Sequence, residues 1–82
     1  MPGRLRRLSG DDVIRILVRW GLVLESQRGS HAKLKRSNPD GGTDVVVVPR
    51  HDELATGTLH GIVRKLSPIV GAAVVRRAFY TD

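Results

Sequence analysis

The sequence predicts an α+β domain of two layers, in which a three-stranded antiparallel sheet is covered by helices on one face. Helical apolar patterns at residues 10–20 and 56–66 flank the middle of the chain. Between them, residues 31–35 alternate between polar and apolar, and a turn-forming cluster at 38–42 separates short β segments. The predicted order is helix, strand, strand, strand, helix, plus a C-terminal helix. A chain of 82 residues has the length of one domain, spanning 1–82.

The first helix is predicted over residues 10–20. Ser9 and Asp12 have capping-box spacing, and Asp11 favours the positive end of the helix dipole. Apolar residues then recur at helical spacing, and Gly21 is a typical helix stop.

Strands are predicted at residues 22–27, 31–35 and 43–48, the last ending at Pro49. Successive strand side chains point to opposite faces, so the middle strand has a core face with Ala32 and Leu34. Its other face is basic and open, and carries His31, Lys33 and Lys35. Residues 45–48 are all valine, which places apolar groups on both faces of that strand. We therefore expect the third helix or another chain to cover them.

The second helix opens at Thr56, and its apolar stripe is Leu59, Ile62, Val63 and Leu66. Ser67 and Pro68 pair an N-cap residue with a proline suited to the first helical position, which predicts that the third helix begins there. Residues 69–75 are β-branched enough that a fourth strand is the alternative. The tail from Arg76 to Asp82 is expected to fray.

Composition favours an anionic polymer as partner. The net charge is +6, and 11 of the 14 basic residues are arginine, whose planar fork suits phosphate. The absence of cysteine excludes disulfides, thiolate zinc sites and cysteine nucleophiles. No apolar run is long enough to span a bilayer, so we expect a soluble, cytoplasmic protein without a membrane partner.

The sharpest chemical feature is the sequence Gly29-Ser30-His31. Glycine allows close approach to a phosphate, serine offers a hydroxyl and an amide, and histidine can transfer protons. RNA cleavage needs little more, because the 2′-hydroxyl is an internal nucleophile and cations stabilise the phosphorane. Arg28, Lys33 and Lys35 are the candidate cations, and all these residues are candidate RNA contacts. From the spacing alone, an ordinary surface turn is the more frequent explanation.

The remaining candidates are weaker. His51 is interpreted as a residue that holds its loop in place, and His60 as a residue on a solvent-exposed helix face. Gly57 and Thr58 place free backbone amides at the start of a helix. Capping of the helix is the favoured interpretation, and a phosphate-binding site is the alternative. The histidine separations match no compact ligand motif, so no metal or other cofactor is predicted.

Taken together, the ordered motifs resemble the HicA-like mRNA interferase toxins of toxin–antitoxin pairs. The resemblance rests on Trp20-Gly21-Leu22, Gly29-Ser30-His31, Pro49, His51, Gly57-Thr58-Leu59, Ile62 and Arg64. It implies a fold like the double-stranded-RNA-binding domain and metal-independent cleavage of mRNA, with His31 essential. It also implies a HicB-like antitoxin that covers the active surface, within an oligomeric toxin–antitoxin complex. Leu22 departs from the family, where many members have an aromatic residue.

Two other function classes stay open at this point. A non-catalytic RNA-binding module of similar fold would use shape and phosphate contacts without cutting. A protein-interaction domain would use the valine strand. His31 directly after Gly29-Ser30 favours the enzyme, because binding alone would be served equally well by another lysine. A neighbouring reading frame for a small antitoxin would discriminate among the three.

Overall fold

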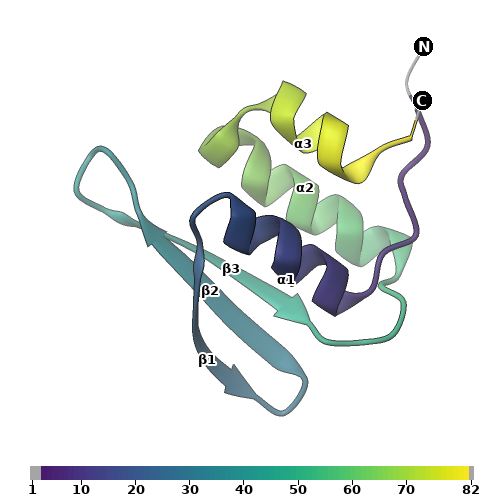
Figure 1. Ribbon diagram of the computed structural model, residues 1–82, viewed down its shortest axis with the longest axis horizontal. Coiled ribbons are helices and arrows are strands. Elements are labelled where there is room, and N and C mark those ends of the chain that lie inside the picture. The colour runs from purple at the N-terminus through teal and green to yellow at the C-terminus, as the bar shows by residue number, and fades with distance from the viewer. Residues whose placement is uncertain (1–2, 82) are drawn as a thin grey trace.

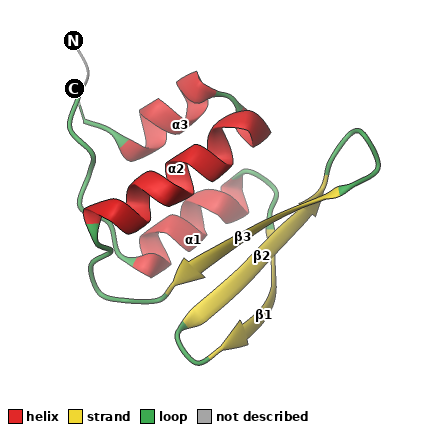
Figure 2. Cartoon of the chain, turned by 180° about the vertical axis from the view of Figure 1, so that it is seen from behind, coloured by secondary structure: helices red, strands yellow, loops and turns green. Residues whose placement is uncertain are grey.

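The computed structural model describes residues 3–81. Its elements, in chain order, are α1 (Gly10–Arg19), β1 (Val23–Arg28), β2 (His31–Ser37), β3 (Thr43–Pro49), α2 (Thr56–Val70) and α3 (Ala72–Phe79). The strands form an antiparallel sheet in the order β1-β2-β3, and the helices lie together on one side of it (Figures 1 and 2). This arrangement confirms the predicted α+β class and element order.

Helix α1 begins with the predicted capping box. The Ser9 hydroxyl accepts a hydrogen bond from the Asp12 amide, and the Asp12 carboxylate accepts one from the Ser9 amide, both at 3.0 Å. The hydrogen bond that the Ser9 amide donates to the carboxylate is the largest cause that holds the pKa of Asp12 below its usual value. The helix ends at Arg19, with Trp20 as its C-cap and Gly21 at φ 89° just beyond.

The two faces of the sheet differ as the alternation in β2 predicts. Ala32 and Leu34 are fully buried beneath the helices, whereas His31, Lys33 and Lys35 are exposed on the outer face. Strand β3 follows the same rule, because Val46 and Val48 are buried and Val47 keeps 48% exposure. The core between sheet and helices is made of hydrophobic side chains: Leu8, Val13, Leu17, Leu22, Ala32, Leu34, Val46, Val48, Leu54, Leu59, Ile62, Leu66, Val75 and Phe79.

The predicted start of the third helix at Ser67-Pro68 is wrong. Helix α2 continues through Pro68 to Val70, and the Ser67 hydroxyl donates to the Val63 carbonyl inside the helix. The break falls at Gly71, whose φ of 97° is readily adopted only by glycine, and α3 follows it. Residues 69–75 therefore end one helix and begin the next, which also excludes the alternative of a fourth strand.

The expectation of a frayed tail is wrong as well, apart from Asp82, which lies outside the described residues. Helix α3 extends to Phe79, whose side chain is fully buried and lies 6.2 Å from the Trp20 ring between centroids. Beyond it, Tyr80 pairs with Leu5 in an antiparallel bridge. The aromatic residues anchor this end because their burial removes a large apolar area from water. Helix α3 packs on α2 (Figure 1).

Candidate functional site

A tight turn between β1 and β2 places His31 at the start of the central strand. Gly29 adopts φ 55°, the left-handed region that glycine occupies at low cost, and Arg28 pairs with His31 across the turn. His31 is exposed on the outer face of the sheet. The turn thus presents the imidazole beside a guanidinium on a surface that the helices do not cover.

An open hollow of about 380 Å³ surrounds this histidine on the outer face, lined by Ser26, Arg28, His31, Lys33 and Val47. Three residues predicted from the sequence, Arg28, His31 and Lys33, are brought together here. The hollow combines one group that can transfer protons with two cations that can bind phosphate oxygens. Ser26 lines it too, although no sequence pattern predicted a role for that residue.

Ser30 contacts the opposite loop and does not line the hollow. Its hydroxyl lies 3.4 Å from Nε2 of His51, and its carbonyl accepts a hydrogen bond of 2.6 Å from the Arg50 amide. The His51 carbonyl in turn accepts from the Gly10 amide at 2.9 Å. These contacts are consistent with the interpretation of His51 as a residue that fixes its loop.

The Arg50 side chain adds a second connection at the same place. Its Nε donates to the Asp11 carboxylate at 2.7 Å, and Nη1 donates to Oε1 of Gln27 at 2.8 Å. One guanidinium therefore joins the start of α1, strand β1 and the loop after β3. Because all of its partners are exposed or half-exposed, its contribution is to position the loop more than to stabilise the whole fold.

Glu25 is a charged residue of this face that sequence reasoning missed. It lies in a β-bulge between Leu24 and Ser26, and its carboxylate forms ion pairs with both Lys35 and Lys33, the latter at 3.4 Å. The hydrogen bond from Lys35 is the largest cause that holds the pKa of Glu25 below its usual value. The two lysines predicted to bind RNA are thus already paired with an acid on the same face.

A known protein family matches most of this chain. A sequence model described as the HicA toxin of bacterial toxin–antitoxin systems matches residues 10–67, which is more than half of the chain. This chain belongs to the HicA toxin family. No curated protein and no solved structure matches it.

The match places the whole outer face of the sheet within the HicA region, together with α1 and most of α2. Helix α3 lies beyond it. The protein is therefore a toxin of a toxin–antitoxin system, and every candidate site residue lies within the part of the chain that the family shares.

The start of α2 in this HicA toxin differs from the favoured interpretation. The N-cap residue is Ala55, which makes no side-chain capping bond, so no side chain caps the first-turn amides at Gly57 and Thr58. Thr58 lines a second hollow that also contains His31, whereas Gly57 lines neither hollow. Only Thr58 is thereby brought near the proposed catalytic group.

Two further observations concern residues 3–81. Within this range, no group of three or more His, Cys, Asp or Glu side chains is arranged to hold a metal ion. Nor does any helix in the described part of the chain have the length and apolar character needed to cross a membrane.

Proposed function

We propose that this HicA toxin is a metal-independent endoribonuclease that cleaves mRNA, with His31 as the catalytic general acid and base. The observation that supports it is the hollow on the outer face, where His31 is exposed between Arg28 and Lys33. A single-stranded backbone can reach this open surface without any movement of the fold. Ser30 and Gly29 shape the turn, while His51 supports it from the neighbouring loop.

The proposed reaction uses the substrate's own nucleophile. His31 accepts the proton of the 2′-hydroxyl as the 2′-oxygen bonds to the adjacent phosphorus. Arg28 and Lys33 bind the equatorial oxygens, whose negative charge grows in the phosphorane. The bond from phosphorus to the 5′-oxygen then breaks, and that oxygen takes a proton from the imidazolium or from water. The products are a 2′,3′-cyclic phosphate and a free 5′-hydroxyl.

A non-catalytic RNA-binding module is the second candidate. The favouring observation is that the basic residues Arg28, Lys33 and Lys35 lie on the open face in one row across β1 and β2. Such a row can bind phosphates without cutting, and binding of this kind makes no demand on His31.

The partner of the toxin is proposed to be a HicB-like antitoxin that covers the active face. Val47 is exposed within the hollow beside His31, so an apolar contact is available at the centre of a basic surface. An acidic inhibitor would pair its carboxylates with the surrounding cations and exclude RNA by occupying the same surface. We place this complex, an oligomer of toxin and antitoxin, in the cytoplasm, where mRNA is found.

Purified toxin is expected to cut single-stranded RNA in the presence of EDTA, and to leave DNA of the same sequence intact because DNA lacks the 2′-hydroxyl. His31→Ala should slow cleavage by about 100-fold or more, since general acid–base catalysis contributes at least that much. His60→Ala is the matched control, because His60 is exposed on α2 and lines neither hollow. Full cleavage by His31→Ala would contradict the catalytic assignment; RNA binding without cleavage by the unmodified protein would favour the binding module.

A further inference from the structure

The edge of β3 carries backbone groups that the sheet does not use. The Arg50 amide donates to the Ser30 carbonyl, which makes these two residues a hydrogen-bonded pair next to the His31–Pro49 pair. Hydrogen-bonded and non-hydrogen-bonded pairs alternate in an antiparallel ladder. Val45 and Val47 therefore occupy non-hydrogen-bonded positions, and their N–H and C=O groups point away from β2. Pro49, which has no N–H, also lies at such a position.

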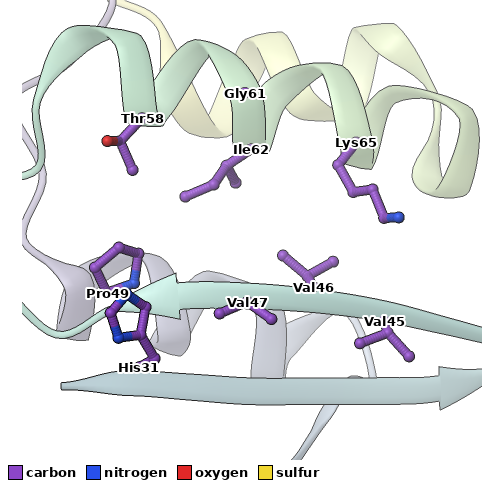
Figure 3. A pocket seen from close by; sticks show the side chains of 9 residues that line it. All are labelled: His31, Val45, Val46, Val47, Pro49, Thr58, Gly61, Ile62 and Lys65. Carbon is purple, nitrogen blue, oxygen red and sulfur yellow. The ribbon is translucent and has the colours of Figure 1, made fainter. Parts of the chain in front are cut away.

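These backbone groups face a groove of about 490 Å³ between β3 and α2. One wall is formed by Val45, Val46, Val47 and Pro49, the other by Thr58, Gly61, Ile62 and Lys65, and His31 lies at one end. Figure 3 shows the two walls facing each other, with Ile62 and Lys65 directed from the helix toward the strand. The groove follows the strand, so an extended chain fits its shape.

Neither close packing nor backbone conformation within residues 3–81 requires a glycine at Gly61, in the middle of the helical wall. A Cβ added there would meet nothing within 4 Å, and its φ lies in the ordinary range. Glycine inside a helix costs about 1 kcal/mol relative to alanine. Close approach of another backbone to the helix would account for a glycine at this position.

The charge of the groove indicates which kind of peptide segment would bind there. Its ionisable lining residues are Lys65 and His31, and no carboxylate lines it among the described residues. Lys65 forms no ion pair within residues 3–81. We propose that the groove binds an extended, acidic segment of a partner protein, which adds to β3 as a fourth strand with a carboxylate beside Lys65.

A second copy of this chain is a poorer occupant. Two copies would each bring a net charge of +6, and the paired β3 strands would place the two basic sheets side by side. An acidic strand instead combines backbone hydrogen bonds with charge attraction. It would also touch His31 from the side of the sheet, without covering Arg28 or Lys33. This proposal is independent of RNA cleavage, because strand binding is measured without RNA.

The test is a titration of the isotopically labelled toxin with a synthetic peptide of sequence Thr-Val-Glu-Val-Thr-Val-Glu, followed by NMR. The amides of Val45, Val47 and Gly61 should shift on binding. Two control peptides should fail to bind: one with lysine in place of each glutamate, and one with N-methyl groups on the backbone nitrogens of alternate residues. Shifts confined to His31, Lys33 and Lys35 would show that the peptide binds the basic face instead, and would overturn the proposal.

Two pairs of variants sharpen the test. Gly61→Gln fills the groove and should weaken peptide binding by about tenfold or more, whereas His60→Gln, one residue away and outside the groove, should leave it unchanged. Lys65→Glu should weaken binding of the acidic peptide and favour the lysine peptide, whereas Arg64→Glu should do neither. Unaltered binding by both groove variants would overturn the proposal. So would a dimer of the toxin alone that Gly61→Gln dissociates, because the occupant would then be a second copy.

Discussion

The two edges of the sheet are built differently. Strand β1 starts with exposed Val23 and Leu24, but the bulge at Glu25 then interrupts its regular pairing and polar residues follow. Strand β3 pairs with β2 without interruption and presents valines to the α2 groove. A bulge and charged side chains are the usual means of preventing an edge from recruiting another strand. The β1 edge has this protection and lies beside the proposed phosphate-binding surface, whereas the backbone groups of the β3 edge stay available to a protein chain.

The largest expected effect is on the free energy of unfolding, and it differs between the buried and the exposed side of β3. Val48→Ala should lower the free energy of unfolding by about 2 kcal/mol, because this fully buried side chain would lose two methyl groups from the core. Val47→Ala should change it by less than about 0.5 kcal/mol, since the side chain is half exposed. Denaturant unfolding of both variants measures the difference. Equal losses would mean that the Val47 side chain already contributes to the stability of the isolated fold and is not available to a partner.

RNA binding should depend on the β2 face and not on α2. Replacement of both Lys33 and Lys35 by alanine should weaken binding about tenfold and reduce the magnitude of the salt slope by about 1.4, at 0.7 per phosphate contact. The double variant Arg64→Ala with Lys65→Ala removes the same charge and should leave the slope almost unchanged. Fluorescence titrations at several salt concentrations would measure both. Identical slopes for the two variants would show that net charge alone determines binding.

At the β3 edge, Gly61→Ala should stabilise the isolated toxin by about 0.5–1 kcal/mol, because a helical glycine is replaced where the new methyl group meets no neighbour. Thermal unfolding of the free protein checks this. A loss of stability would show that Gly61 already has a role within the chain, and would remove one argument for the strand site.

The smallest effect concerns the β1 edge. Glu25→Gln removes the carboxylate that pairs with Lys33 and Lys35, so RNA affinity should rise about threefold. The pKa of Glu25 is lowered in the folded protein, so its contribution to stability is present above the unfolded value and is lost as pH falls through the folded value. RNA affinity of the unmodified toxin should therefore rise toward that of Glu25→Gln as pH falls below the usual range of a glutamate. Parallel pH profiles for both proteins would contradict this role.

Much of the fold could be predicted because its signals are local. The capping box at Ser9 and Asp12, the turn at residues 38–42 and the alternation in β2 depend only on neighbouring residues. The helix break was misplaced because Ser67-Pro68 is a strong local start signal, whereas Gly71 provides the backbone conformation that the break requires. Burial of Phe79 depends on contact with Trp20, a residue far away in the chain. The local sequence carries no sign of this contact, and for that reason the tail was expected to fray.

The candidate site was predictable where pairing is regular and not elsewhere. The hollow with Arg28, His31 and Lys33 follows from one tight turn and the alternation after it. Glu25 could not be assigned, because a bulge shifts the register by one residue and leaves no clear mark in the sequence. The groove beside β3 was also missed, because it depends on the distance between a strand and a helix from different parts of the chain.

The antiparallel bridge between Leu5 and Tyr80 has a mechanical consequence. The two segments also exchange hydrogen bonds from the Arg6 amide to the Phe79 carbonyl and from the Thr81 amide to the Arg4 carbonyl, so the first and last described segments of the chain lie side by side (Figure 1). A force that pulls the ends apart therefore loads these bonds one after another, as in a zipper, and not all together in shear. Traction on the C-terminal end first opens the bridge and then draws Phe79 out of the core. Resistance to such a force would therefore come from the buried Phe79 side chain and not from the bridge, whose hydrogen bonds open singly.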